Sequence, residues 1–251
     1  MNNVIWSKLI AREDLTSFEV QILRPPCAKV TLVSYMQDPE QVVARVCDTY
    51  SGVLDNYWRD DQQILSAVDD MRKTKLKTPL EMLHFIWLFN GVSRAFTHQL
   101  VRYRVGTSFA QESMRFFGQK DQYNVLATGK CTEKWLHDYG KNVASSISLY
   151  EDMIQNSVPS EDARGILPTN ILTSIFFDCN LLTFQNIFNQ RVCCQAQAGE
   201  WIPILIQMRK IIEEQIPELK DLITAPVERG ESCGYGAKFD RPCTWKNGIP
   251  K

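Results

Sequence analysis

Residues 80–90 (LEMLHFIWLFN) are nearly all apolar or aromatic, and this run restricts the folds that the chain can adopt. It is much shorter than the roughly 18 apolar residues that a membrane-spanning helix needs. A run of this length fits a strand buried on both faces or a helix of the core. Phe85, Trp87 and Phe89 alternate along it, which favours the strand. Ser93 follows at the position of a helix N-cap, so we expect a buried strand that leads into a helix.

The other segments predict both strands and helices. Short segments rich in Val, Ile and aromatic residues predict three strands within residues 3–36. Apolar residues recur at helical spacing in residues 38–50, 53–77, 131–158 and 171–214, the last with one or more breaks near Gly199. We therefore expect a single compact α+β domain over residues 1–223, with a mixed or antiparallel sheet flanked by long helices. Residues 224–251 are rich in Gly and Pro and are expected to form a tail of loops.

The overall charge argues against two broad classes of partner. Among the 251 residues, 28 Lys and Arg nearly balance 29 Asp and Glu, and the formal net charge is -1. General attraction to nucleic acid or to an anionic membrane is therefore not expected. No apolar run reaches the length of a membrane span, and the N-terminal sequence MNNVIWSKLIARED lacks the pattern of a secretory signal. We expect a cytoplasmic protein.

The stretch from Gly91 to Phe117 concentrates arginine. Its four arginines are Arg94, Arg102, Arg104 and Arg115. Between Glu81 and Asp121 the only acidic residue is Glu112. A guanidinium group binds phosphate and carboxylate through a planar fork of donors. The stretch predicts either a site for an anionic ligand or, as the alternative, a basic surface patch or an ion-pair network within the protein.

The eight cysteines leave two interpretations open. In a reducing compartment, free thiols are the default. The alternative is a structural zinc ion that orders the tail. Its ligands would come from Cys193, Cys194, Cys233 and Cys243. Because their spacing is irregular, we predict no metal site.

Several ordered blocks of the sequence resemble the flavin-dependent thymidylate synthases. The family signature is Arg-His-Arg, seven residues and Ser, preceded by a helix much like GVSRAFTHQLVR, and this chain has Arg102-Tyr103-Arg104 and Ser113 in that place. The other similar blocks are residues 30–52, Thr78–Glu81, residues 158–173 and residues 180–197. Together they cover roughly residues 30–215 in the order of the family. The chain is identified by this resemblance as a member of the family.

The resemblance implies reductive methylation of dUMP to dTMP. In the family, methylenetetrahydrofolate gives the carbon, FAD carries the hydride and NADPH reduces the FAD. The resemblance also implies a homotetramer whose sites are built from several subunits. Because the family uses flavin chemistry without a covalent enzyme nucleophile, Ser113 is expected to bind the nucleotide and not to attack it.

The resemblance also assigns roles to individual residues. Implied substrate contacts are Gln99, Arg102, Gln111, Ser113, Arg115, Arg164 and Arg191. Implied cofactor contacts are Thr78, Arg102, Tyr103, Arg104, Gln111, Asn180 and Asn186. Arg191 is the implied catalytic residue, because its family counterpart contacts the pyrimidine edge and favours an ionised N3, which makes C5 more nucleophilic. The alternatives are helix–helix ion pairing for Arg164 and Arg191, and buried, hydrogen-bonded amides for the two asparagines.

The chain departs from the family pattern within the signature. Tyr103 stands where the family usually has His; its ring can stack on a flavin but carries no positive charge at neutral pH. Eight residues instead of seven separate Arg104 from Ser113, which predicts a one-residue bulge between Val105 and Gln111. These departures motivate two alternatives: a flavin-dependent methylase or hydroxymethylase of another pyrimidine nucleotide, and a non-catalytic nucleotide-binding oligomer. Two further departures are Leu76, for a His, and Leu182, for an Arg of some members.

Overall fold

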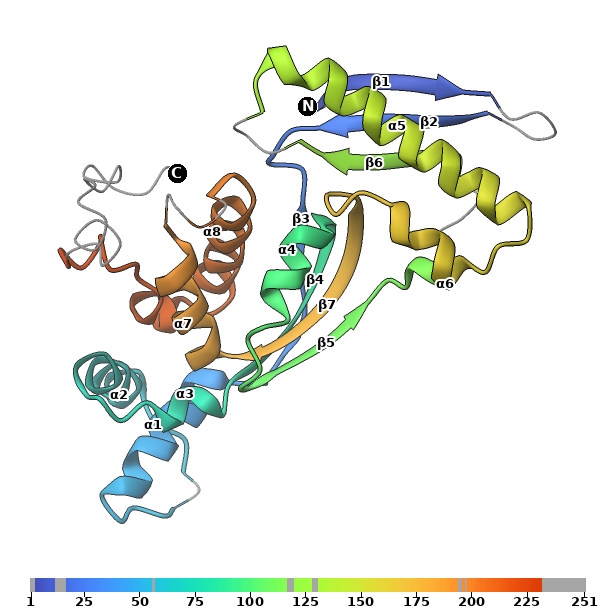
Figure 1. Ribbon diagram of the computed structural model, residues 1–251. Helices are drawn as coiled ribbons and strands as arrows, with labels where there is room; N and C mark the ends of the chain where they lie inside the picture. Colours follow the sequence, from blue (N-terminus) through green and yellow to red (C-terminus); the bar gives the residue numbers. More distant parts are fainter. Residues whose placement is uncertain are drawn as a thin grey trace. The chain divides into compact units, whose positions relative to one another are not determined.

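Two β-sheets carry the fold (Figure 1). The computed structural model describes residues 3–11, 17–55, 57–116, 120–127, 131–193, 196 and 198–231. The first sheet has the strand order β1-β2-β6 and the second has the order β3-β4-β7-β5. The expected α+β class is confirmed, although two sheets stand where one was expected. The described residues of this domain pack as two compact units, each assembled from separate segments of the chain.

The first unit combines Met1–Lys29, Phe89–Arg102 and Ala110–Ile175. Its sheet consists of β1 (Val4–Ile10), β2 (Phe18–Leu23) and β6 (Gln122–Leu126). Strand β2 pairs antiparallel with β1 and parallel with β6, so this sheet is mixed, as expected. Apolar and polar residues alternate along β2, and this places Phe18, Val20 and Ile22 on one buried face.

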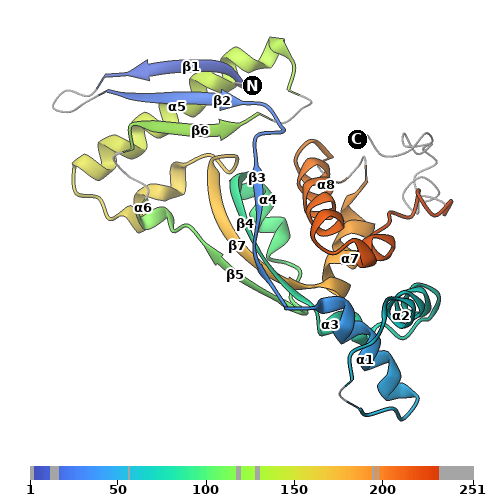
Figure 2. The same ribbon diagram turned by 180° about the vertical axis from the view of Figure 1, so that it is seen from behind.

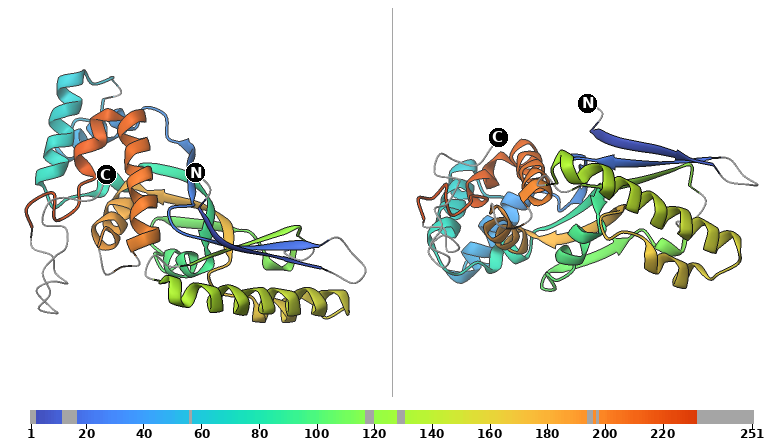
Figure 3. Two further views of the ribbon diagram at one scale, coloured as in Figure 1. Left: turned by 90° about the horizontal axis from the view of Figure 1, so that it is seen from above. Right: turned by 45° about the horizontal axis from the view of Figure 1, so that its top comes forward.

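Helix α5 (Glu133–Gln155) covers the buried face of this sheet (Figures 1 and 3). Val143, Ala144 and Ile147 join the sheet residues in one core cluster. Gly140 allows a close approach, because a Cβ atom there would lie 2.6 Å from the ring of Trp6 in β1. The helix expected over residues 131–158 is therefore confirmed, and its glycine has a packing role.

Four short elements complete the first unit. They are α4 (Arg94–Leu100), η1 (Met114–Phe116), α6 (Ser160–Ala163) and η2 (Arg164–Ile166). The Oγ atom of Ser93 accepts a hydrogen bond from the Phe96 backbone N–H at 3.0 Å, so Ser93 caps α4 as predicted. The backbone of α4 is also tied to the segment after η2, since the Arg94 N–H donates to the Ile171 carbonyl at 3.0 Å.

The second unit combines Val30–Leu88, Tyr103–Phe109 and Phe176–Lys251 (Figure 2). Its helices are α1 (Pro39–Tyr50), α2 (Asp61–Lys73), α3 (Thr78–Glu81), α7 (Leu181–Arg191), α8 (Ala198–Gln215) and η3 (Pro217–Leu222). Helix α1 packs on α2, α3 packs on α7, and α7 packs on α8. In the core, the rings of Trp87 and Phe184 lie 6.4 Å apart.

The strands of the second sheet are β3 (Lys29–Tyr35), β4 (His84–Ser93), β5 (Thr107–Gln111) and β7 (Leu172–Asn180). Four of the five boundaries between the two units fall inside these strands, and the fifth lies between Arg102 and Tyr103. The alternation in residues 80–90 correctly predicts strand β4, because Phe85, Trp87 and Phe89 are all buried. Strand β3 is the first strand in the order of the sheet, and β5 is the last.

Two predicted helices are wrong in their extent. Residues 172–180 form β7, because LTSIFFDCN alternates between buried and more exposed side chains and only then gives way to α7. Helix α2 begins at Asp61 and not near residue 53, because Asp60 and Gln63 form a reciprocal capping box at its start. The loop before it is held by the buried Arg59, which is paired with Asp48 and Asp55.

One predicted extended segment is too long, and the expected C-terminal tail lies partly outside the described residues. The extended pattern of residues 109–117 ends at Gln111, and η1 follows it. The tail expected over residues 224–251 is described only as far as Glu231, where it contains turns. In the described part of the chain, no helix combines the length and the apolar character that crossing a membrane requires.

Candidate functional site

Three arginines of the first unit, Arg94, Arg115 and Arg164, form what we call the arginine cluster. Arg94 begins α4, Arg115 lies in η1, and Arg164 joins α6 to η2. Element α6 packs on η1, and the Nε atom of Arg115 lies 3.6 Å from a carboxylate oxygen of Glu161 in α6. The Arg164 Nε–H donates to the backbone carbonyl of the same Glu161 at 3.2 Å. Residues far apart in the sequence are thus brought to one place.

Acidic side chains offset this cluster only in part. The carboxylate of Glu112 accepts from Lys120 Nζ at 2.9 Å and from the Thr173 hydroxyl at 3.4 Å. Arg94 instead donates to the Glu112 backbone carbonyl, at 3.4 Å. Burial lowers the pKa of the Arg94 guanidinium, the positive charge of Arg164 lowers it further, and Glu112 opposes both effects. An anionic ligand would relieve the repulsion between the two guanidinium groups.

Arg94 was noticed in the sequence as part of the arginine-rich stretch, but it was not among the predicted contact residues. It lies in the helix that precedes the Arg102 signature, and this position alone did not mark it as a ligand contact. The structure adds it, because the hydrogen bonds of α4 to the segment at Thr169 and Ile171 bring its side chain near Arg164. The signal available in the sequence was the scarcity of acids around it.

The predicted nucleotide residues of the signature lie beside this cluster. The Gln111 amide donates to the Thr97 hydroxyl of α4 at 3.0 Å, so the end of β5 is tied to α4. Ser113 is exposed, and its hydroxyl accepts from the Arg115 backbone N–H at 3.3 Å. Gln99 is half-buried in α4. The structure therefore brings Gln111, Ser113, Arg115 and Arg164 into the same part of the first unit.

Tyr103 and Arg191 meet in the second unit. The Nε–H of Arg191, the last residue of α7, donates to the Tyr103 hydroxyl oxygen at 2.8 Å. That hydroxyl donates in turn to the side-chain carbonyl of Gln190 at 3.2 Å. The guanidinium carbon of Arg191 lies 4.8 Å from the ring centroid of Trp201 and 5.7 Å from that of Tyr103. Arg191 thus hydrogen-bonds Tyr103 and packs on two aromatic rings, one of them Trp201 of α8.

The two remaining signature arginines face solvent. Arg102 and Arg104 are exposed on either side of Tyr103. Within the described ranges, neither side chain makes a hydrogen bond or an ion pair. Such guanidinium groups suit an anionic group such as the diphosphate of a flavin dinucleotide. The donor set therefore fits the cofactor that the resemblance implies.

The signature continues into a turn that Asn180 supports. Gly106 has φ 63°, and a Cβ atom there would lie 2.2 Å from the Asn180 side chain. The prediction that Asn180 lies inside a helix together with Asn186 is wrong, because Asn180 is the N-cap of α7. Its side-chain oxygen accepts a hydrogen bond from the Thr183 N–H at 2.8 Å. Asn180 is only 6% exposed, which agrees with the alternative of a buried, hydrogen-bonded amide. Its contact with a flavin stays a prediction.

The other predicted cofactor residues are accessible. Asn186 is exposed on α7, and Thr78 is exposed at the start of α3. Helices α3 and α7 pack against each other in the second unit, so these two residues belong to neighbouring elements. Their flavin contacts are not tested by any bound group and remain predictions.

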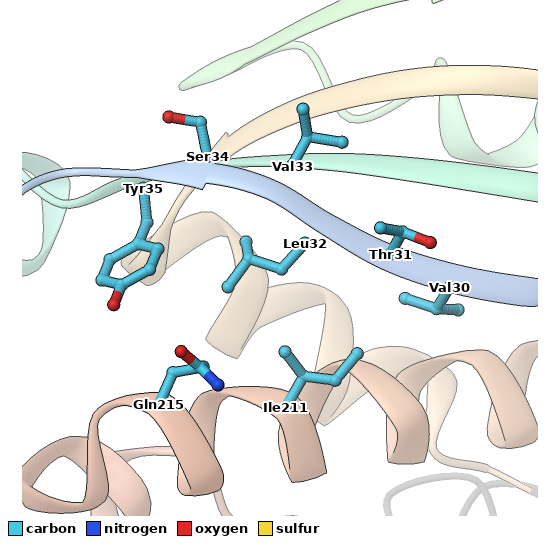
Figure 4. A pocket seen from close by; sticks show the side chains of 8 residues that line it. All are labelled: Val30, Thr31, Leu32, Val33, Ser34, Tyr35, Ile211 and Gln215. Carbon is cyan, nitrogen blue, oxygen red and sulfur yellow. The ribbon is translucent and has the colours of Figure 1, made fainter.

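Two cavities lie away from all these residues. One, of about 510 Å³, lies between β3 and α8 and is lined by Val30–Tyr35, Ile211 and Gln215 (Figure 4). The other, of about 320 Å³, lies beside α1 and includes Arg45 and Asp55. Neither of these two cavities is lined by a predicted site residue.

The zinc alternative gains no support where it can be examined. Cys193 is buried, whereas Cys194, Cys233 and Cys243 lie outside the described residues. In the described ranges there is no group of three or more His, Cys, Asp or Glu side chains that could hold a metal ion.

Comparisons with known proteins agree with the motifs. A family model described as "Thymidylate synthase complementing protein" matches residues 31–218. A flavin-dependent thymidylate synthase of Geobacter sulfurreducens is 28% identical over 85% of this chain and 97% of its own length. The protein of the same name from Sulfurisphaera tokodaii is 32% identical over 76% of this chain and 73% of its own length.

A solved structure shares the fold. The crystal structure of a UMP/dUMP methylase from Streptomyces cacaoi, bound with 5-Br dUMP, has a TM-score of 0.64 and covers 78% of this chain and 94% of that chain. At 15% sequence identity this likeness shows the fold alone. The family match is carried by the sequence: it spans most of the chain and includes every predicted contact residue. The chain therefore belongs to the thymidylate synthase complementing protein family, the family of the flavin-dependent thymidylate synthases.

Proposed function

We propose that this chain catalyses the reductive methylation of dUMP to dTMP, with FAD as cofactor, methylenetetrahydrofolate as carbon donor and NADPH as reductant. One observation carries the proposal most directly. Arg94, Arg115 and Arg164 gather in the first unit, and nearby carboxylates offset them only in part. A nucleoside monophosphate carries a phosphate with the charge and the acceptor oxygens that such a cluster binds.

The phosphate end of the nucleotide is assigned to residues of the first unit. The arginine cluster binds the phosphate, and the exposed Ser113 hydroxyl adds a neutral hydrogen-bonding group beside it. Gln111 is held by Thr97 and offers its side-chain oxygen as an acceptor. Charge-assisted bonds of this kind fix the orientation of the nucleotide before the reaction, which lowers the entropic part of the barrier.

The flavin is assigned to the exposed cationic groups of the signature and to α3 and α7. Arg102 and Arg104 offer donors to its diphosphate, and Thr78 and Asn186 offer uncharged polar groups. The bound flavin supplies the hydride, which is chemistry that no side chain of the protein provides. The chain contributes binding, orientation and exclusion of water.

Arg191 is the residue proposed to act on the base. A fixed guanidinium beside the pyrimidine edge favours an ionised N3 and so increases the electron density at C5. Stabilisation of this kind contributes about 3 kcal/mol in sites shielded from water. Arg191 is suited to the role because the bond from its Nε–H to Tyr103 fixes the plane of the guanidinium.

The proposed assembly is a homotetramer in the cytoplasm. Its support is an apolar surface on three neighbouring strands of the second sheet, where Val33 is 50% exposed, Ile86 39% and Phe176 44%. Figure 4 shows Val33 pointing away from the α8 residues Ile211 and Gln215. Light scattering should give about four times the chain mass of 28.9 kDa. Ile86→Lys should dissociate the assembly, whereas the control Leu65→Lys, at an exposed position of α2, should not. A monomeric wild type would reject the tetramer.

The decisive experiment is product analysis by mass spectrometry. Purified protein is incubated with FAD, methylenetetrahydrofolate, NADPH and dUMP, and formation of dTMP is expected. Omission of each component in turn should abolish the product. Protein that binds no flavin after FAD is added would reject the proposal, whatever nucleotide is supplied.

A second candidate is a flavin-dependent methylase or hydroxymethylase of another pyrimidine nucleotide. It is motivated by Tyr103, which replaces the usual His and contacts Arg191, the residue proposed to face the base. The methylase of Streptomyces cacaoi that shares the fold is named for both UMP and dUMP. The same assay with UMP, dCMP and CMP separates the candidates: product from one of these and not from dUMP favours the second. Nucleotide binding without any product would instead indicate the non-catalytic oligomer.

A further inference from the structure

We propose that Tyr103 is a positioning residue that holds Arg191 in the orientation needed to act on the pyrimidine. This inference rests on the proposed function, in which Arg191 faces the base, and it goes beyond the family pattern, in which a histidine usually occupies the place of Tyr103. It also differs from the cofactor contact expected for Tyr103 from the sequence. Both residues belong to the second unit, so the argument lies within one compact body.

The Tyr103 hydroxyl accepts one hydrogen bond and donates another, to neighbouring residues of α7. The phenol oxygen of Tyr103 accepts from Arg191 Nε–H at 2.8 Å, and its proton goes to Gln190 Oε1 at 3.2 Å. Tyr103 therefore uses its acceptor on the guanidinium and its donor on a neutral amide. Gln190 and Arg191 are consecutive residues at the end of α7, so one phenol fixes both side chains of that helix end.

Two aromatic rings enclose the same guanidinium. The Tyr103 and Trp201 rings meet edge to face, with centroids 6.4 Å apart and an interplanar angle of 74°. The Arg191 guanidinium carbon lies 4.8 Å from the Trp201 centroid and 5.7 Å from the Tyr103 centroid, within the range of cation–π attraction. Trp201 is only 1% exposed, so it is a fixed support and not a mobile surface ring.

The chemistry of the groups explains why the contact suits a positioning role. A guanidinium has five N–H donors: the Nε–H, which Tyr103 accepts here, and the four N–H groups of the two terminal nitrogens. The bond through Nε restricts rotation of the planar group, and a group held in one plane loses less entropy when it recognises a planar ligand edge. A phenol carries no positive charge, so it adds no repulsion to Arg191.

The test uses the full-length protein and 5-fluoro-dUMP, whose ultraviolet spectrum changes when N3 ionises. The midpoint pH of N3 ionisation in the bound nucleotide is measured without turnover, and kcat and KM are measured with dUMP. Tyr103→Phe keeps the ring and removes the hydroxyl. We expect it to raise the midpoint for N3 ionisation and to lower kcat about tenfold, with a much smaller change in KM.

A double-mutant cycle with Arg191→Lys decides whether Tyr103 acts through Arg191. If it does, Tyr103→Phe has no further effect on the midpoint or on kcat once Arg191 is replaced. Multiplicative effects in the double variant would overturn the inference, and so would a Tyr103→Phe variant identical to the wild type. Tyr57→Phe is the matched control, because Tyr57 lies in an exposed loop of the same unit and is 77% exposed.

Two further measurements separate the possible failures. The flavin dissociation constant of Tyr103→Phe should equal that of the wild type; a large loss of flavin would identify Tyr103 as a cofactor contact and overturn the positioning role. If Tyr103→Phe does not fold, Gln190→Ala tests the same contact from its other side, with a smaller shift of the midpoint expected and no shift rejecting the inference. A wild-type protein that binds neither flavin nor nucleotide rejects the proposed function and this inference together, whereas an active wild type with an unaffected Tyr103→Phe rejects the inference alone.

Discussion

Replacing Arg94 by Gln should weaken nucleotide binding without weakening the fold. The side chain makes one long hydrogen bond, 3.4 Å from Nη1 to the Glu112 carbonyl, so its loss costs at most about 0.5 kcal/mol, the lower end of the usual range. The change also removes a partly buried charge whose pKa is lowered by burial and by Arg164. These effects oppose each other, and the free energy of unfolding should change by less than about 0.5 kcal/mol.

The effect on the phosphate should be much larger. A hydrogen bond between a guanidinium and a phosphate contributes about 1.5–3 kcal/mol, which corresponds to a roughly 10- to 100-fold higher dissociation constant for dUMP. Isothermal titration calorimetry measures this constant, and urea unfolding measures the stability of the same preparation. The difference in affinity should shrink as salt is added, because partly exposed charges are screened.

The control is Arg72→Gln, which removes an exposed arginine paired with Asp69 at 2.6 Å on α2. It should leave the dUMP dissociation constant unchanged. Two results would refute the reasoning about Arg94: an unchanged affinity for dUMP, or a loss of stability of several kcal/mol. The second would mean that the guanidinium is a structural group and that the arginine cluster needs no anion.

Three further changes test other parts of the structure. Gly106→Ala should lower the free energy of unfolding in urea by about 1–3 kcal/mol, because the backbone has φ 63° and the new Cβ would lie 2.2 Å from the Asn180 side chain; an unchanged midpoint would contradict this. The Cys179 thiol should resist alkylation at pH 8 in the native protein and react after unfolding, since it is fully buried and burial raises its pKa. Arg59→Gln should destabilise the protein at pH 7 and less near pH 3. The hydrogen bond from Arg59 lowers the pKa of Asp55, so its contribution is present above the unfolded pKa of Asp55 and is lost as the pH falls through the folded pKa. Urea unfolding at the two pH values measures it, and an equal loss at both would refute the pairing.

Local patterns in the sequence predict much of this fold. Ser93 could be recognised as the cap of α4 because a small polar residue precedes a helical pattern, and the alternation of Phe85 and Trp87 identifies β4. The strand β7 was not recognised, because its apolar residues run directly into those of α7 and the change of period occurs at Asn180. The start of α2 was misplaced because Asp60, one of several acids in the segment, is the one that caps it.

The contacts between the site residues could not be predicted from the sequence. The arginine-rich stretch and the family motifs identify its residues, but spacing alone does not reveal which of them meet. Tyr103 and Arg191 are joined by a hydrogen bond across 88 positions of the chain, and Gln111 and Thr97 lie on different elements. Such contacts depend on the packing of whole helices and strands, so they appear only in the folded chain.

The parallel pairing of β2 with β6 has a consequence for synthesis of the protein. Glu19 pairs with Gln122, so β2 emerges from the ribosome about 100 residues before its partner. At about 5–20 residues per second, the interval is roughly 5–20 s. During this time the apolar face formed by Phe18, Val20 and Ile22 has neither β6 nor α5 to cover it. The N-terminal hairpin is thus the segment of the nascent chain that we expect molecular chaperones to engage first.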